Sequence, residues 1–153
     1  MSVRVQREDF DVGAELATLT SGRHGIGGVC LFVGLVRDLA GDKPIAAMTL
    51  EHYPGMTEKE LERIEAEARA RWPLEETLIV HRHGRLEPGD NIVLVAAASA
   101  HRGAAFEAAR FLMDFLKTRA PFWKLEDIGG DSRWVDARDG DDAAAARWRE
   151  ASR

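Results

Sequence analysis

The stretch HRGAAFEAARFLMDFLKTRAPFWK, residues 101–124, decides the fold of this chain. It follows an apolar run, Ile92 to Ala98, that is typical of a buried strand. Apolar residues then recur at helical spacing and predict one buried stripe, made by Phe106, Ala109, Met113 and Leu116 and widened by Ala105, Leu112 and Phe115. Pro121 cannot continue a helix, so the helix should end at about Arg119 or Ala120.

Basic residues flank both ends of this predicted helix. His101 and Arg102 come at its start, where free backbone N–H groups favour anions. Lys117 lies in its last turn, and Lys124 follows the proline. We expect the turn at the proline to bring Lys124 back toward Lys117, with the aromatic pair Phe122–Trp123 excluding water around them. The spacing therefore predicts an anion pocket along this one element.

Each basic residue also has a structural interpretation, and the residues alone leave both open. A lysine in the last turn of a helix complements the helix dipole. Lys124 lies between aromatic and acidic neighbours, as many surface lysines do. His101 is equally suited to be a capping or a core histidine.

Length and composition limit the class of protein. At 153 residues the chain is most simply one domain, 1–153, with a polar tail from about residue 140. The net charge is −5, which excludes a general binder of nucleic acid or of anionic membranes. No apolar run reaches the roughly 18 residues that span a bilayer, and the first ten residues lack the apolar core of a signal peptide. With a single cysteine, Cys30, no intramolecular disulfide can form, so we expect a cytoplasmic protein.

The first half of the chain contains further helix and strand signals. Asp11 predicts the N-cap of a helix that closes at Ser21-Gly22. Val29 to Val36 is nearly all apolar and predicts a buried strand, with Cys30 as a packed core thiol. Arg37 follows this strand, where it is either a surface residue or a guanidinium at the rim of a pocket.

The later elements alternate strands with helices. Ala47 to Tyr53 predicts a strand, and Thr57 with Glu60 predicts a capping box for a helix that Trp72-Pro73 stops. Thr77 to His83 predicts another strand, and Ala143 to Trp148 a short terminal helix. The pattern lacks a regular βαβ alternation, which favours an α+β fold with a mostly antiparallel sheet and flanking helices.

Two histidines, His81 and His83, share one face of the predicted strand at 77–83. This i, i+2 spacing suits a metal ion, but no third ligand is evident in the sequence. We therefore expect no bound metal.

Five segments together resemble one family of enzymes, the large, catalytic subunit of molybdopterin synthase. The segments are FVGLVRD (32–38), LEHYPGMTEKELERI (50–64), HRHGRLEPGD (81–90), SAHRGAAFEAARFLMDFLK (99–117) and APFWKLE (120–126). The resemblance implies an α/β-hammerhead-type fold in a homodimer. It also implies a small ubiquitin-like sulfur-carrier subunit on each protomer, which gives a heterotetramer.

The same resemblance implies a reaction and its residues. The C-terminal glycine thiocarboxylate of the small subunit would deliver sulfur to cyclic pyranopterin monophosphate, and two transfers would build the dithiolene of molybdopterin. The resemblance marks Lys117 and Lys124 as catalytic. It assigns substrate binding to Arg37, His101, Arg102, Lys117, Lys124 and Glu126.

The chemistry of these side chains suits that reaction. A cyclic phosphate is held well by charge-assisted hydrogen bonds from His101, Arg102 and Arg37. A lysine cation stabilises an oxyanion that develops on an acyl group, and clustered cations lower one another's pKa. Glu126 would orient Lys124 rather than act as a base, and the resemblance implies that this subunit needs no metal or organic cofactor of its own. The alternative is a non-catalytic module of the same fold that binds a phosphorylated pterin or a ubiquitin-like partner.

Overall fold

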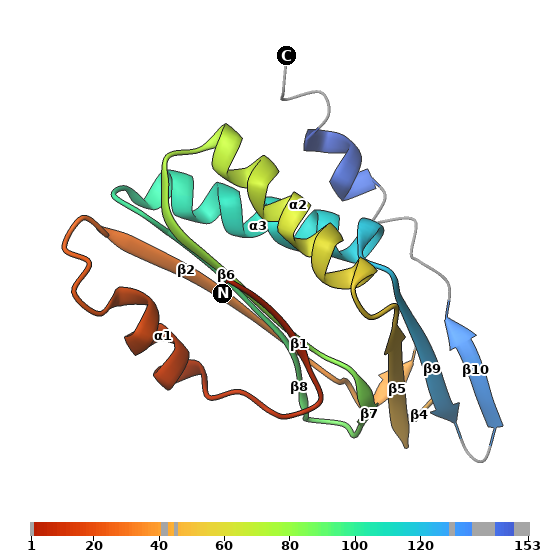
Figure 1. Ribbon diagram of the computed structural model, residues 1–153. Helices are drawn as coiled ribbons and strands as arrows, with labels where there is room; N and C mark the ends of the chain where they lie inside the picture. Colours follow the sequence, from red (N-terminus) through yellow and green to blue (C-terminus); the bar gives the residue numbers. More distant parts are fainter. Residues whose placement is uncertain (1, 41–42, 45, 129–130, 136–142, 149–153) are drawn as a thin grey trace.

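The computed structural model describes residues 2–40, 43–44, 46–128, 131–135 and 143–148 (Figure 1). Its first sheet has the strand order β1-β6-β8-β2. The strands span Val3–Gln6 (β1), Leu74–Arg82 (β6), Asn91–Ser99 (β8) and Gly28–Leu35 (β2). Only β1 and β6 are parallel; the other neighbours are antiparallel.

The second sheet is antiparallel throughout and has the order β10-β9-β5-β7. Its strands span Asp131–Val135 (β10), Phe122–Ile128 (β9), Ala47–His52 (β5) and Gly84–Leu86 (β7). A small ladder pairs β3 (Leu39–Ala40) with β4 (Lys43–Pro44). The chain passes from β6 in the first sheet to β7 in the second through the single residue His83, so the two sheets are joined there.

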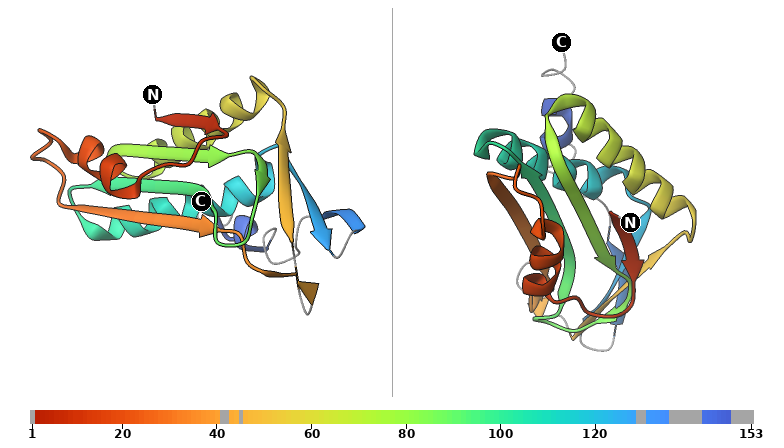
Figure 2. Two further views of the ribbon diagram at one scale, coloured as in Figure 1. Left: turned by 90° about the horizontal axis from the view of Figure 1, so that it is seen from below. Right: turned by 60° about the vertical axis from the view of Figure 1, so that its left-hand side comes forward.

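The helices cover both faces of the first sheet. Figures 1 and 2 show α2 (Met56–Arg71) and α3 (Arg102–Arg119) side by side over one face, with α1 (Val12–Thr20) against the other. Alternation along the strands explains this, because successive side chains point to opposite faces. On β6, Ile79 packs in the α2–α3 core, whereas Leu78 and Val80 pack with Leu19 of α1.

The overall class expected from the sequence, α+β with a mostly antiparallel sheet and flanking helices, is confirmed. Several boundaries are also confirmed. Asp11 caps α1 by accepting a hydrogen bond from the Ala14 N–H at 3.0 Å, and α3 ends at Arg119 before Pro121. A terminal helix forms at 143–148. The rest of the polar tail expected from about residue 140 lies outside the described residues.

The predicted stripe of α3 is wrong in one residue. Phe106 is 62% exposed, although its spacing placed it with the core. The buried face of α3 is shifted away from Phe106 and consists of Ala105, Ala108, Ala109, Phe111, Leu112, Phe115 and Leu116, with Met113 half-buried at its edge. The error arises because a run of alanines is compatible with more than one apolar face.

The strand predicted at Val29–Val36 exists, but it is not buried throughout. β2 is an edge strand of its sheet, so one side of its backbone has no strand partner among the described residues. Phe32 and Leu35 are 45% and 51% exposed. Cys30 is half-buried beside Ala97 and Ala108, and burial raises the pKa of its thiol. An apolar sequence cannot distinguish a central strand from an apolar edge.

The capping box predicted from Thr57 and Glu60 is also wrong. α2 begins two residues earlier than that pattern implies, with Gly55 as the N-cap at φ +86°. The carboxylate that accepts from the Gly55 N–H belongs to Glu58. Thr57 is buried and instead donates its hydroxyl to the Tyr53 carbonyl oxygen at 2.9 Å.

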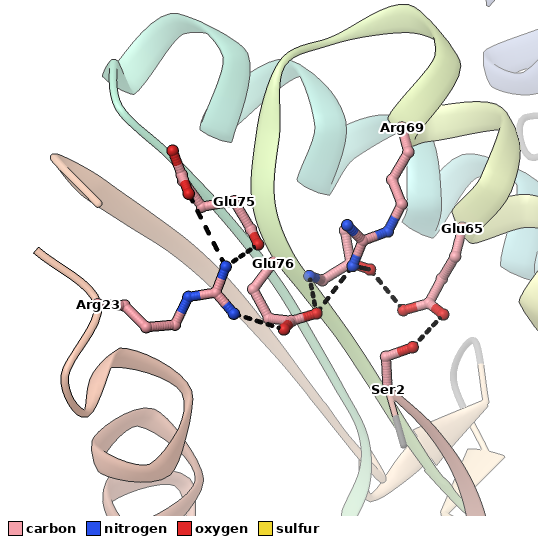
Figure 3. A network of polar contacts seen from close by, with 7 residues as sticks. Ser2, Arg23, Glu65, Arg69, Glu75 and Glu76 are labelled. Carbon is pink, nitrogen blue, oxygen red and sulfur yellow. Dashed lines mark hydrogen bonds and ion pairs between the residues drawn. The ribbon is translucent and has the colours of Figure 1, made fainter. Parts of the chain in front are cut away.

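A polar network connects α2 and β6 with Arg23, which follows α1, and with Ser2, which precedes β1 (Figure 3). Arg23 pairs with Glu75 and Glu76, and Arg69 pairs with Glu76. Deeper in the same network, the buried Glu65 carboxylate accepts from Ser2 Oγ and Thr77 Oγ1, both at 2.6 Å. Burial raises the pKa of Glu65, although its two hydrogen bonds oppose that effect.

The terminal helix at 143–148 packs on the core formed by α2 and α3. Trp148 is only 5% exposed and makes edge contacts with Trp72 and Phe111. Its indole N–H donates to Asp114 Oδ2 at 2.6 Å, and Arg71 donates to its carbonyl oxygen at 2.9 Å. Among the described residues, no helix is long and apolar enough to cross a membrane.

Candidate active site

The C-terminal end of α3 and the strand that follows it carry the two lysines. Lys117 lies in the last turn of α3, Pro121 ends the helix, and Lys124 is the third residue of β9. On β9, alternation places Phe122, Lys124 and Glu126 on the same face. Their partners across the ladder, His52, Leu50 and Met48, show that this face is directed inward, because Leu50 and Met48 are buried.

His81 of β6 lies between the elements that carry the lysines. Its ring stacks on the Phe122 ring, with centroids 3.8 Å apart and planes 17° from parallel. Its Nδ1 is 2.8 Å from the Arg82 carbonyl oxygen, so Nδ1 carries the proton and donates it. The side chain is buried, with 5% exposed.

The pKa of His81 responds to burial and to the charges of both lysines. Burial is the main cause that lowers its pKa to about 3, and the charges of Lys117 and Lys124 lower it further. His52 acts in the same direction, while the hydrogen bond to Arg82 opposes it. The imidazole is therefore neutral at pH 7. Both lysines lie close enough for their charges to act on one ring, as expected from the turn at Pro121.

The aromatic neighbours of the lysines differ from those predicted. Phe122 faces inward with Lys124, but Trp123 lies on the opposite face of β9 and is 39% exposed. Trp123 instead meets Tyr53 edge to face, with ring centroids 4.5 Å apart. It therefore cannot exclude water around Lys124. The second ring beside Phe122 is that of His81, which the sequence suggested only as a weak metal ligand.

The other histidines of this region form contacts of their own. The His52 ring is 4.5 Å from the His83 ring and 5.9 Å from the Phe122 ring. His52 Nδ1 lies 3.1 Å from Thr57 Oγ1 at the start of α2. In the part of the chain that the structure describes, no group of three or more His, Cys, Asp or Glu side chains is arranged to hold a metal ion.

Glu126 lies two residues beyond Lys124 on the same face of β9. It is 8% exposed, which is unusual for a carboxylate and indicates polar or charged neighbours. Its position is consistent with the expectation that it orients Lys124. A buried acid, two lysines and a neutral imidazole thus lie near the junction of α3 and the second sheet, where Lys117 is exposed and Lys124 is half-buried.

His101 and Arg102 are placed away from the lysines. His101 is the N-cap of α3, its side chain makes no cap hydrogen bond, and both residues are exposed. Fifteen residues separate Arg102 from Lys117, which at 1.5 Å per residue is about 22 Å along the helix. One chain therefore does not bring its predicted anion-binding residues and its lysines into a single pocket.

Arg37 lies at the lysine end of the molecule. β2 pairs with β8 so that Gly28 meets Ser99, next to the start of α3, and Leu35 meets Asn91 at the other end. The second half of α3 packs over Val93, near the start of β8. Arg37, just past the end of β2, therefore shares the end of the sheet with Lys117, and it is exposed.

Comparisons with known proteins agree with this fold. A family model described as MoaE protein matches residues 5–119. A "Molybdopterin synthase catalytic subunit" from Mesorhizobium japonicum is 58% identical over 153 residues, which cover 99% of this chain and 95% of that protein. A solved structure, "Molybdopterin biosynthesis MoaE protein" from Burkholderia ambifaria, superposes with a TM-score of 0.84 at 56% identity, covering 97% of each chain.

A more distant structure shares the fold alone. It is described as a "Protein-protein complex of subunit 1 and 2 of Molybdopterin-converting factor" from Helicobacter pylori. Its TM-score is 0.75 at 20% identity, and the match covers 90% of this chain and 92% of that one.

Proposed function

Because the chain belongs to the MoaE family and is a sulfurtransferase of the molybdopterin synthase type, we propose that Lys117 and Lys124 are its catalytic residues. The reaction moves sulfur from the C-terminal thiocarboxylate of a small subunit to cyclic pyranopterin monophosphate and forms the dithiolene of molybdopterin. The observation that carries the assignment is the approach of both lysines to one buried, neutral imidazole.

The lysines suit the charge that this reaction develops. The thiocarboxylate sulfur replaces an oxygen substituent of the pterin and so forms an acyl thioester between the two. When water adds to the acyl carbon of this thioester, negative charge grows on the acyl oxygen, and the acyl–sulfur bond then breaks to leave sulfur on the pterin and a carboxylate on the small subunit. An ammonium group held beside that oxygen stabilises the charge, and the effect is large where water is excluded. Lys117 is exposed and Lys124 is half-buried in the free chain, so the bound substrate and small subunit have to supply this exclusion of water. Glu126 orients Lys124 from the adjacent inward-facing position of β9.

We propose that the substrate phosphate is bound by Arg37, His101 and Arg102, with the last two supplied by a second copy of the chain. The separation of about 22 Å along α3 supports this, because one copy cannot bring both ends of its own helix to one substrate. Arg37 and Lys117 of one copy share one end of the first sheet, and His101 and Arg102 lie at the other end.

The free edge of β2 supports a dimer that would meet this requirement. If two copies pair antiparallel along β2, the twofold axis makes β2 and α3 of the second copy run opposite to those of the first. The start of one α3 then lies near the end of the other. The exposed side chains Phe32 and Phe106 lie on β2 and α3, the two elements near this edge. Such a homodimer with one small ubiquitin-like subunit per copy is a heterotetramer. We propose that it acts in the cytoplasm.

The test is single-turnover formation of dithiolene from the purified chain, a thiocarboxylated small subunit and cyclic pyranopterin monophosphate. We expect Lys117→Ala and Lys124→Ala to lose roughly a hundredfold or more in rate, the usual cost of removing one group that stabilises an oxyanion. Lys59→Ala, which removes an exposed lysine of α2, is the matched control and should keep the wild-type rate.

Thermal unfolding of the same three variants separates catalysis from stability. A lysine that only complements the helix dipole contributes about 0.3–1 kcal/mol of stability and nothing to the rate. If both active-site variants keep near-wild-type rates while their melting temperatures fall slightly, Lys117 and Lys124 are not catalytic.

A further inference from the structure

His81 is a buried group that the proposed chemistry does not use directly. It lies on β6 of the first sheet, while its stacking partner Phe122 begins β9 of the second sheet. These two strands are not hydrogen-bonded neighbours, because β6 pairs with β1 and β8, and β9 pairs with β5 and β10. The stack is therefore a side-chain contact that connects the two sheets.

This contact lies on the path that sets the position of Lys124. Phe122 follows Pro121 directly and precedes Lys124 by two residues on the same face of β9. Lys117 is fixed separately, by α3, whose second half is packed on the first sheet through Phe111 and Phe115. The distance between the two ammonium groups thus depends on how β9 is held against the first sheet.

The imidazole is held in one orientation. Its Nδ1–H donates to the carbonyl oxygen of Arg82, and its ring is stacked on Phe122 at 3.8 Å. The charged groups around it are Lys117 from α3, Lys124 from β9 and His52 from β5. A third permanent cation here would repel both lysines, whereas a neutral ring adds no charge.

We propose that His81 is a positioning residue for sulfur transfer: through its stack with Phe122 it fixes β9 so that Lys124 faces the same site as Lys117. The proposal rests on the proposed function, since it assigns His81 a role in that reaction. A shift of about 1 Å in a reacting group is enough to reduce a rate by as much as roughly a hundredfold. Loss of the stack should therefore affect the chemical step more than binding.

The experiment compares three substitutions in the complete complex with the thiocarboxylated small subunit. His81→Gln removes the ring and keeps an amide donor. His81→Phe keeps a ring for the stack and removes the donor. His83→Gln is the matched control, because His83 contacts His52 and makes no ring contact with Phe122 among the described residues. The rate constant, KM for the cyclic pterin and melting temperature are measured for each.

We expect His81→Gln to reduce kcat by about tenfold or more with KM nearly unchanged, and His81→Phe to stay within about threefold of wild type. His83→Gln should match wild type. A kcat for His81→Gln equal to wild type would overturn the proposal. So would a loss in His81→Phe as large as that in His81→Gln, because the stack would then not be the cause.

A second route keeps the proposal testable if His81→Gln fails to fold. Phe122→Leu removes the same stack from the β9 side and should show the same fall in kcat. The double variant Phe122→Leu with His81→Phe should lose no more kcat than Phe122→Leu alone, because both substitutions act through the same ring contact. Fully additive losses would contradict this. If the wild-type complex itself forms no dithiolene, the proposed function fails, and that result is distinct from failure of the role of His81.

Discussion

Mixing two inactive variants should restore activity if each active site takes residues from two copies of the chain. The perturbation is a pair of single substitutions, Lys117→Ala in one preparation and Arg102→Ala in the other. The reasoning depends on α3, which runs without interruption from Arg102 to Arg119. Its length places Arg102 about 22 Å from Lys117 of the same copy.

The expected magnitude follows from the symmetry. In a mixed dimer one site contains both substitutions, and the other contains neither. Random exchange at equal concentrations makes half of the dimers mixed, so about one quarter of all sites should be wild type. Each variant alone should be weak: Arg102→Ala loses a charge-assisted contact of about 1.5–3 kcal/mol, and Lys117→Ala loses roughly a hundredfold in rate.

The assay is single-turnover dithiolene formation after the two variants are mixed, subunits are exchanged under mild denaturant, and the mixture is returned to native conditions. A mixture of Lys117→Ala with Lys124→Ala, taken through the same exchange, is the control. Both residues belong to the same end of one copy, so each mixed dimer keeps two damaged sites and no activity returns. If the Lys117→Ala and Arg102→Ala mixture stays as inactive as its components, the two-copy site is wrong.

Three further predictions concern stability. The pKa of His81 is lowered from 6.5 to about 3 in the folded state, so the stability that the neutral ring provides is complete above pH 6.5 and is lost as the pH falls toward 3. Urea unfolding at pH 7 and pH 5 should show that the free energy of unfolding falls by up to about 1.4 kcal/mol per pH unit, and this fall should be absent in His81→Phe. The pKa of Glu65 is raised above 4.5, so the folded state holds the proton of this carboxyl more tightly than the unfolded chain does, and stability falls as the pH rises above 4.5. The stability of Glu65→Gln relative to wild type should therefore increase between pH 4 and pH 8. A difference in unfolding free energy that stays constant over this range would contradict this. Trp148→Ala should lower the free energy of unfolding in chemical denaturation by about 3–5 kcal/mol, because it removes a buried indole and leaves Asp114 without that donor. Arg147→Ala, on the exposed side of the same helix, should change it by almost nothing.

The sequence by itself determined the local structure around α3. Pro121 cannot donate a backbone hydrogen bond or continue a helix, so the end of α3 at Arg119 could be derived from one residue. Asp11 likewise predicted the start of α1, since a carboxylate there satisfies a free N–H. The family also followed from the resemblance of five short segments, which contain the charged residues that sulfur transfer needs.

The separation of Arg102 from Lys117 was also within reach of the sequence. A helix of the predicted length already places its two ends too far apart for one substrate. The interpretation of a single pocket came from treating residues on one element as neighbours. Neighbours on a helix are three or four residues apart, not fifteen.

Only the tertiary structure decided which apolar residues are buried and what surrounds the lysines. Phe106 and Phe32 are as hydrophobic as Phe111, but they are 62% and 45% exposed as the described part of the chain packs. His81 and Phe122 are distant in sequence and belong to different sheets, so their stack follows from the packing of the sheets and from no local pattern. Burial and the pKa of His81 depend on everything that packs around the ring, and that information is spread over the whole chain.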